Sequence, residues 1–534
     1  MSAGDIFYSA RVPGFTGRGD KYLGDIAREL RRMLWKTQNT FSLPSCRLPD
    51  AAWSDVAALL VEWAEDIHND IGLWHAVETH QRQCFGTPLP LIMDAGAKDD
   101  LAGFDPRRIQ FFLWNSWHWM NPDLMLSPTH GDLKRLAEAA SRLLTERFAR
   151  LPQDSGVKHF LATPNDYGWD IKRKLLWMGI NSYLFRFLFL NYLDDEERDP
   201  DIDAKDDFVC GHCTEWSGLG VIDVLAGTLD LPEQDRATLR TWYERHRSFF
   251  RVLARHEEGG EVKTITARNV VNGEPYTIRM NVSVCPFEPG MVVYGALTPW
   301  RGEWVWSGQQ KTFGNVPEHE DGKLRKEMLE TASAIAYRYC ADEAAKALEF
   351  TREHHAKFVA HHGNELVVFP DGLVMAAAEQ KRMGAEWRMA NPEHVARVMR
   401  ERGLEHPRPR MKLPPEVLNH DHGIGVFSNP DEGQEIALRF NLALSGLRKK
   451  GVGMTGDETE TLRRLVTDAA ISPAFIRRLA AEHGMESLAE TFLIRHASPA
   501  QTLEFLLRRH KGHFFRKRYP SLSLLQETGK SGGQ

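Results

Sequence analysis

The apolar residues between Ala51 and Cys84 recur every three or four positions, the spacing that gives a helix one buried face. They are Val56, Leu59, Leu60, Trp63, Ile67, Ile71 and Trp74. Asp105 followed by Pro106 is a helix-capping residue and a first-turn proline, so another helix is predicted to begin there. We therefore expect long helices in this part of the chain.

The pattern changes after residue 246, where β-branched or aromatic residues alternate with polar ones. Dipeptides that favour tight hairpin turns interrupt the alternation; they are Gly259-Gly260, Asn272-Gly273 and Arg301-Gly302. Several short strands in so short a stretch favour a closed barrel. The sequence predicts a small antiparallel β-barrel over 246–315, with a hairpin turn at Asn272-Gly273.

Helical patterns return after the predicted barrel, and Ser472-Pro473 and Ser498-Pro499 each combine a helix cap with a helix-starting proline. The predicted fold class is α+β, predominantly α. Its predicted parts are an N-terminal extension over 1–50, an all-helical domain over 51–205, a linker and helix over 206–245, the barrel over 246–315, a helical segment with a short strand over 316–404, a Pro-rich linker and loop over 405–434, a basic helical domain over 435–520 and a flexible tail over 521–534.

The amino-acid composition indicates the class of protein but not its activity. The chain has 534 residues, 42% of them hydrophobic and 26% charged, with a net charge of −6, which is the balance of a soluble globular protein. The most apolar run, "LLWMGINSYLFRFLFLNYL", contains Arg186, and a charge in mid-span is costly in lipid. We expect a cytoplasmic protein with no membrane partner.

The "CGHC" stretch at 210–213 offers a redox dithiol, half of a zinc site, or two structural thiols. A redox dithiol needs a helix N-terminus to lower the thiol pKa, and an acidic linker precedes this one instead. Zinc needs four ligands, and no second CxxC or HxxH completes the set. We predict that Cys210 and Cys213 are reduced and hold no metal.

No phosphate-binding loop, dinucleotide fingerprint, nucleophile elbow or zinc-protease motif is present, so no cofactor is predicted. Whether the protein is an enzyme stays open. If it is one, two polar groups are candidates for its site. The first is Asn165, Asp166, Asp170, Lys172 and Arg173, and the second is the loop of His420, Asp421 and His422, which a tight turn explains equally well.

Two features are candidate binding surfaces. Trp300, Trp304 and Trp306 form either an aromatic platform or part of the barrel core. The C-terminal basic stretch either contacts phosphates and bases or is a solvated helix end. Its candidate residues are Arg508, Arg509, Lys511, Phe514, Phe515, Arg516, Lys517, Arg518 and Tyr519.

Three segments, "PNDYGWDIKRKLLWMGINSYLFR", "ISPAFIRRLAAEHG" and "LLRRHKGHFFRKRYPSLS", together resemble a family of bacterial proteins described only as a domain of unknown function, over most of the chain. The stretch from "SFFRVLARHEEGG" to "GMVVYGALTPWRGEWVWSG" is similar to the β module that often precedes SEC-C zinc motifs. The Cys-rich SEC-C tail is absent, so its zinc role does not transfer. The resemblance implies a bacterial cytoplasmic protein and supplies no catalytic residue.

The leading hypothesis is a non-enzymatic binding or scaffold protein whose partner is nucleic acid or another protein, with no small-molecule ligand identifiable. The rival hypothesis is an enzyme of unrecognised class. An enzyme should have a deep cleft where polar groups converge, whereas an interaction protein should have a shallow basic or aromatic patch.

Overall fold

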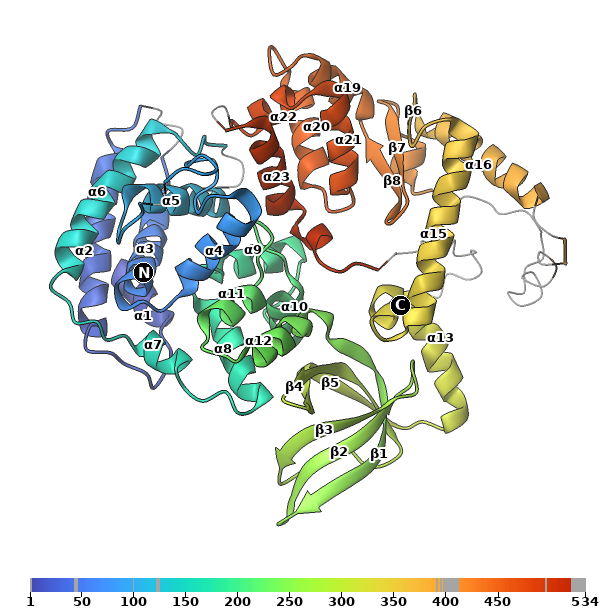
Figure 1. The fold of residues 1–534 in the computed structure, drawn as a ribbon, viewed down its shortest axis with the longest axis horizontal. Helices are drawn as coiled ribbons and strands as arrows, with labels where there is room; N and C mark the ends of the chain where they lie inside the picture. The colour runs from blue at the N-terminus through green and yellow to red at the C-terminus, as the bar shows by residue number, and fades with distance from the viewer. Residues whose placement is uncertain are drawn as a thin grey trace. The chain divides into compact units, whose positions relative to one another are not determined.

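The structure, a computed structural model, describes residues 2–42, 47–98, 100–121, 125–389, 392–393, 396, 413–494 and 497–519. The chain forms two compact units (Figure 1). Unit 1 comprises residues 1–329 and 492–516, and unit 2 comprises 330–491 and 517–534. Among the described residues, no helix has the length and apolarity needed to cross a membrane. The predicted tail at 521–534 and the proline-rich residues 405–412 lie outside the described residues.

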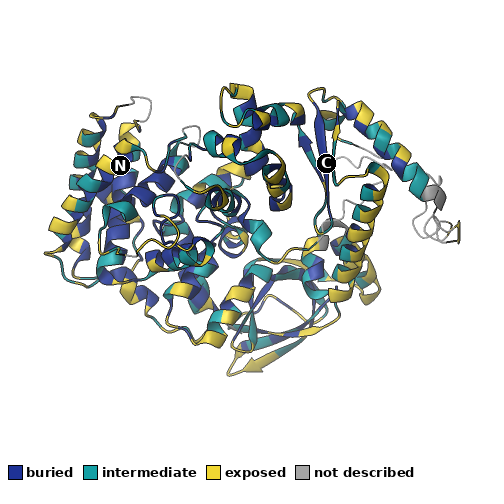
Figure 2. Ribbon diagram, turned by 45° about the horizontal axis from the view of Figure 1, so that its top comes forward, coloured by how far each residue is buried: buried dark blue, intermediate teal, exposed yellow. Residues whose placement is uncertain are grey.

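The N-terminal part of unit 1 is helical. Its helices are α1 (Ala3–Ser9), α2 (Asp20–Gln38), α3 (Asp50–Asn69), α4 (Leu73–Phe85), α5 (Pro106–Met120), α6 (Gly131–Phe148), α7 (Gly156–Leu161), α8 (Gly168–Asn181), α9 (Arg186–Asp195), α10 (Ile202–Gly211), α11 (Val221–Thr228) and α12 (Glu233–Arg240). Buried residues lie on the inward faces of these helices and exposed residues on the outward faces (Figure 2). The segment 1–50, predicted as an extension, instead supplies α1 and α2, because Leu23, Leu30 and Leu34 are buried in the helical core.

Aromatic side chains from several helices fill this core. Trp74 of α4 makes edge-to-face contacts with Trp63 of α3 at 6.0 Å and with Trp216 at 5.8 Å between ring centroids. Phe112 of α5 lies 6.0 Å from Trp74. Such pairs add to the stability gained from burial alone. The high tryptophan content of the sequence is therefore explained largely by packing.

The predicted barrel is confirmed. It consists of β1 (His246–Glu258), β2 (Glu261–Asn269), β3 (Pro275–Val282), β4 (Met291–Trp300) and β5 (Glu303–Asn315), closed in the order β1-β2-β3-β5-β4. All pairings are antiparallel except the closing contact, in which β3 meets β5 in parallel. Apolar side chains such as Phe250, Ile265 and Leu297 fill its interior.

The hairpin turns follow the prediction at two of three places. Gly259-Gly260 and Arg301-Gly302 have positive φ at both residues, as a two-residue turn of the primed type requires. At Asn272-Gly273 only Gly273 has positive φ, at 78°. The β2–β3 connection is a longer loop over 270–274, in which the Gly273 amide donates to Asn269 O at 2.8 Å. The predicted hairpin connection at Asn272-Gly273 is therefore present, but as a longer loop and not as a two-residue turn.

Unit 2 combines helices with a small antiparallel sheet in the order β6-β7-β8. Its helix α15 contacts β7 and β8, and α19 and α21 contact β7. The strands are β6 (Leu366–Phe369), β7 (Ile424–Asn429) and β8 (Gly433–Leu438), and the helices are α13 (Asp321–Thr331, which begins in unit 1), α14 (Ser333–Ala336), α15 (Ala341–His362), α16 (Gly372–Met389), α18 (Pro415–Leu418), α19 (Phe440–Arg448), α20 (Gly456–Thr467), α21 (Pro473–His483) and α22 (Glu486–Thr491). The sequence analysis placed β7 in a linker, because a wholly buried strand shows no alternation.

After unit 2 the chain returns to unit 1 through a segment that we call the strap, residues 497–516, which contains α23 (Pro499–His510) and a short 3₁₀ turn, Gly512–Phe515. The predicted cap is present, since the Ser498 hydroxyl accepts from the Gln501 amide at 3.2 Å. Phe505, Leu506 and Leu507 are buried. The strap is thus an integral part of unit 1, whereas it was predicted to belong to a separate basic domain over 435–520.

Candidate functional site: a polar pocket beside helix α10

Helix α10 forms from the acidic stretch that was predicted to be a linker. Asp201 caps its N-terminus by accepting from the Ala204 amide at 2.7 Å, and Asp203 lies in its first turn, where the helix dipole favours negative charge. The later residues Asp206 and Asp207 lie farther along the same helix. α10 packs against α8 on one side and against β5 of the barrel on another.

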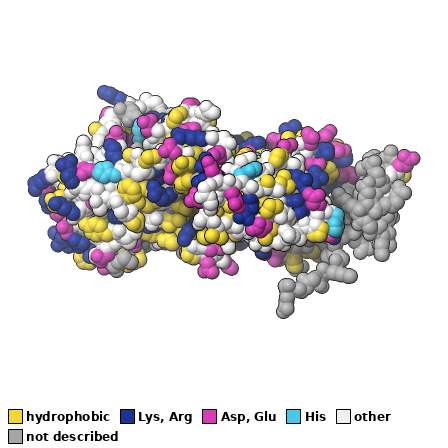
Figure 3. Space-filling model, turned by 90° about the horizontal axis from the view of Figure 1, so that it is seen from below, with side chains coloured by type: hydrophobic (Ala, Val, Ile, Leu, Met, Phe, Trp, Pro, Cys, Tyr) yellow, Lys and Arg dark blue, Asp and Glu magenta, His cyan; other side chains and the backbone are white. Residues whose placement is uncertain are grey.

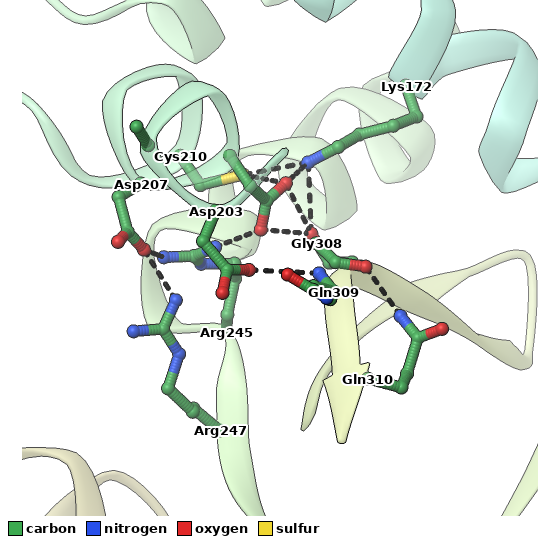
Figure 4. A network of polar contacts seen from close by, with 12 residues as sticks. Lys172, Asp203, Asp207, Cys210, Arg245, Arg247, Gly308, Gln309 and Gln310 are labelled. Atoms are coloured by element: carbon green, nitrogen blue, oxygen red, sulfur yellow. Dashed lines mark hydrogen bonds and ion pairs between the residues drawn. The ribbon is translucent and has the colours of Figure 1, made fainter. Parts of the chain in front are cut away.

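Asp206 is the centre of a buried polar network. Its side chain is 1% exposed, and it pairs with the Lys172 ammonium from α8 and the Arg245 guanidinium that precedes β1. The Ser307 hydroxyl of β5 donates to Asp206 at 3.0 Å and accepts from Lys172 at 2.9 Å. Figure 4 shows Lys172 and Cys210 converging on this point, with Lys172 Nζ 3.3 Å from Cys210 Sγ. Although burial alone raises the pKa of Asp206, Lys172 and Arg245 hold it below its ordinary value.

Asp207 carries a second set of ion pairs on the adjoining side of α10. It pairs with Arg245 at 2.6 Å, with Arg198 at 3.0 Å and with Arg247. Burial opposes ionisation here too, but these guanidinium groups lower the pKa of Asp207 to about 2. Both carboxylates are therefore ionised at neutral pH, and the helix is held to the barrel by charge-assisted hydrogen bonds.

Strand β5 departs from regular pairing where it meets α10. Ser307 pairs with Ala296 and Lys311 with Tyr294, so three residues of β5, 308–310, lie opposite one residue of β4. Gly308 has φ +74°, and a Cβ there would lie 2.9 Å from an Asp206 oxygen. The Gln309 amide, freed from the ladder, donates to Asp203 at 2.9 Å. Bulges of this kind turn side chains toward functional sites in many sheets.

The bulge, β4 and α10 enclose a pocket of about 420 Å³, within the range of small-molecule sites. Two cations reach it, Arg247 and Lys311, and one carboxylate, Asp203. Lys311 has no ion pair among the described residues, and its ammonium lies 5.4 Å over the Phe313 ring. The remaining lining is polar or small: Tyr294, Gly295, Ala296, Ser307, Gln309 and Gln310.

The network is suited to binding more than to covalent catalysis. Lys172 contacts both Asp206 and the Ser307 hydroxyl as a hydrogen-bond donor, which is a binding role and not that of a base. Burial raises the pKa of the Cys210 thiol, which disfavours the reactive thiolate. No group of three or more His, Cys, Asp or Glu side chains in the described part of the chain is arranged to hold a metal ion.

Of the first predicted polar group, residues 165–173, only Lys172 lies at this site. Asn165 binds the buried Lys174, and Asp166 pairs with Arg301 at 3.2 Å. Asp170 accepts from the Tyr167 amide at 3.0 Å at the start of α8. The exposed Arg173 places its guanidinium 5.4 Å over a phenylalanine ring.

The second predicted polar group lies in unit 2 and forms a turn. The His420 ring accepts from the Arg439 amide at 2.7 Å, which fixes its position. Asp421 and His422 are exposed and lie 3.5 Å apart. The geometry there fits the tight-turn alternative, because Gly423 has φ +82° and a Cβ on it would meet Asn441.

The "CGHC" stretch ends α10. Cys210 is buried in the last turn, and Cys213 lies beyond the end of the helix. Neither thiol is in a disulfide. His212 stacks on Phe208 at 5.1 Å, and burial lowers its pKa to about 4. A redox thiol is activated at the N-terminus of a helix, whereas these two cysteines lie at the C-terminus of one. The absence of metal stays a prediction.

The three tryptophans of the barrel strands all pack within the protein, Trp304 and Trp306 against the barrel core and Trp300 against Trp242 outside it. Trp300 is 2% exposed and donates to Asn165 O at 3.1 Å. The geometry fits the core alternative better than an exposed platform.

The C-terminal basic residues are engaged within the protein. Arg509 is buried and pairs with Glu215 at 2.6 Å, and Lys511 is fully buried. Arg516 lies 3.5 Å over the Tyr243 ring and pairs with Asp223 at 3.1 Å. The remaining candidates also have partners: Arg508 contacts Glu504 and Phe515, Phe514 contacts His513, Lys517 lies over Tyr519, and Arg518 pairs with Glu432. Nucleic-acid binding by these residues stays a prediction, and their placement does not favour it.

Residues 19–203 match the model of a family described as a protein of unknown function, DUF3843. The match runs from α2 to the start of α10, which is less than half of the chain. It confirms the resemblance to a family of unknown function for this part. No curated protein and no solved structure is significantly similar to the chain. The likeness of the barrel to the SEC-C module stays a prediction.

Proposed function

We propose that this is a non-enzymatic binding protein, and that the pocket between α10 and the barrel takes a small polar molecule carrying a phosphate or carboxylate group. The observation that carries the proposal is Lys311, a cation at the pocket with no ion pair among the described residues. An anionic ligand would supply the missing partner. The side-chain amides of Gln309 and Gln310 can hydrogen-bond it.

The pocket is well prepared for an anion. Arg247 is held at its rim by Asp207, so the guanidinium is fixed in place before a ligand arrives. The one lining carboxylate, Asp203, already accepts the Gln309 amide, which reduces its repulsion of an anion. Both features lower the cost of binding an anion.

The other candidate functions have weaker support. A nucleic-acid role for the strap would require Arg509 and Arg516 to leave Glu215 and Asp223. An enzymatic role at Lys172 would require the side chain to leave its ion pair with the buried Asp206.

Thermal unfolding of the full chain with inorganic phosphate, citrate or glucose tests the proposal. Phosphate or citrate should raise the unfolding temperature more in the wild type than in Lys311→Met, because a ligand stabilises the state that binds it. General salt effects act equally on both proteins and cancel in this comparison. Lys263→Met on the barrel is the matched control and should behave as the wild type does. An equal response of wild type and Lys311→Met to every compound would contradict the proposal.

A further inference from the structure

Helices α2 and α6 lie side by side and run in opposite directions at one end of unit 1 (Figure 1). Arg147, near the end of α6, pairs with Glu29 of α2 at 2.6 Å. At the other end of the pair, Arg135 near the start of α6 donates to Thr40 O at 3.2 Å, just after α2. The two helices therefore present a continuous outer face.

That face is basic in a protein whose net charge is negative. Residues 18–38 and 131–150 contain eleven Lys and Arg against six Asp and Glu. Two of those six carboxylates, Asp20 and Asp132, are buried beneath the face. Figure 3 shows Lys and Arg side chains gathered at the left-hand end, where Figure 1 places α2 and α6.

Many of these cations are available to an external partner. Five exposed basic residues on the face have no ion pair among the described residues: Lys21, Arg32, Lys36, Lys134 and Arg142. Lys21, Arg32 and Lys36 share one side of α2, since they lie eleven and then four residues apart. They extend over about 22 Å of the helix at 1.5 Å per residue. The strap, by contrast, uses its cations internally.

Exposed aromatic rings accompany the charges. Tyr22 and Trp35 of α2 are 44% and 43% exposed. Tyr22 lines an open groove of about 840 Å³ between α2 and the end of α6, whose basic lining residues are Arg18, Lys21, Arg147 and Arg150. Aromatic rings beside a row of cations provide both elements of single-strand recognition, base stacking and phosphate contact.

We propose that the outer face of α2 and α6 binds single-stranded nucleic acid, with phosphates on its cations and bases stacked on Tyr22 and Trp35. This surface is separate from the pocket beside α10 and does not depend on the function proposed for it. Single strands are favoured over duplex, because stacking needs bases that are not already paired.

Fluorescence anisotropy with the full chain and a labelled oligothymidylate of about 20 nucleotides tests the inference. Binding should weaken steeply with salt, with a logarithmic slope of about −0.7 for each phosphate contacted. The triple variant Lys21→Glu, Arg32→Glu, Lys36→Glu should lower the affinity by about tenfold or more. Trp35→Ala should lower it by about fivefold or more through lost stacking.

A matched triple reversal elsewhere on unit 1, Arg240→Glu, Lys263→Glu and Lys323→Glu, should leave the affinity within about twofold of wild type, because those residues lie off the face. Circular dichroism should show nearly equal unfolding temperatures for the wild type and both triple variants, since exposed charges contribute little to stability. The inference is overturned by any of three results: no binding at low salt, equal loss in both triple variants, or binding to anionic phosphatidylserine vesicles without binding to the oligonucleotide.

Discussion

Lys174 is a fully buried lysine whose ammonium meets only neutral groups. It donates to Thr163 O at 2.6 Å and to Asn165 Oδ1 at 2.5 Å. Burial lowers its pKa to about 8, although Asp170 partly opposes the shift. The sequence analysis noted the neighbouring charged residues and missed Lys174, because a lysine in a helical pattern is ordinarily exposed.

Because the pKa of Lys174 is lower in the folded protein than in the unfolded chain, the stability of unit 1 should change with pH in the alkaline range. In the unfolded chain Lys174 loses its proton near its ordinary pKa of 10.5, whereas in the folded protein it loses the proton near pH 8. The free energy of unfolding should therefore rise between pH 8 and 10.5, by up to about 3 kcal/mol. Urea unfolding at several pH values measures this rise. Lys174→Met should remove that component, whereas Lys263→Met should retain it.

The elements of the barrel could be predicted from the sequence, because alternation and turn residues are local signals. Gly259-Gly260 and Arg301-Gly302 define their turns through backbone conformation alone. Helix α10 could not be recognised in the same way, since its acidic surface is compensated by Arg245 and Lys172, which are distant in sequence. The candidate pocket depends on that pairing. The sequence analysis singled out none of the residues that line the pocket, and only Lys172 and Cys210 of the buried network beside it.

One local signal of the pocket was present in the sequence. Gly308 interrupts a strand pattern, and a glycine at such a place often marks a bulge or a close approach. In the structure it marks both, since β5 bulges there and Asp206 lies against the missing side chain.

A pair of glycine substitutions separates those two roles. Gly302 and Gly308 both have positive φ, but a Cβ would meet nothing within 4 Å at Gly302 and would meet Asp206 at 2.9 Å at Gly308. Gly302→Ala should cost about 1 kcal/mol through backbone strain. Gly308→Ala should cost about 2 kcal/mol more, because it also displaces the buried carboxylate. Equal losses in urea unfolding would show that α10 does not need this close approach.

At the scale of the whole molecule, unit 1 is assembled from both ends of the chain. The strap covers the loop that follows α10, and a Cβ on its Gly512 would lie 2.5 Å from the Cα of Gly218. Local patterns identified α23 correctly, with its Ser498-Pro499 start. They could not show which unit the helix joins, because that depends on contacts such as Arg509 with Glu215, nearly three hundred residues apart.

If Arg516 were part of an exposed basic surface, reversing its charge would leave stability nearly unchanged; its position in the structure predicts instead a large loss of stability. Its guanidinium covers the Tyr243 ring at 3.5 Å and pairs with Asp223, so Arg516→Glu would place two carboxylates together and uncover the ring. We expect it to lower the free energy of unfolding by about 3 kcal/mol. Arg150→Glu, at a side chain 70% exposed, should change it by less than about 0.5 kcal/mol. Urea unfolding followed by tryptophan fluorescence compares the two variants. Equal stability would mean that the strap leaves unit 1 in solution, and its cations would then be free to meet phosphates as the sequence analysis predicted.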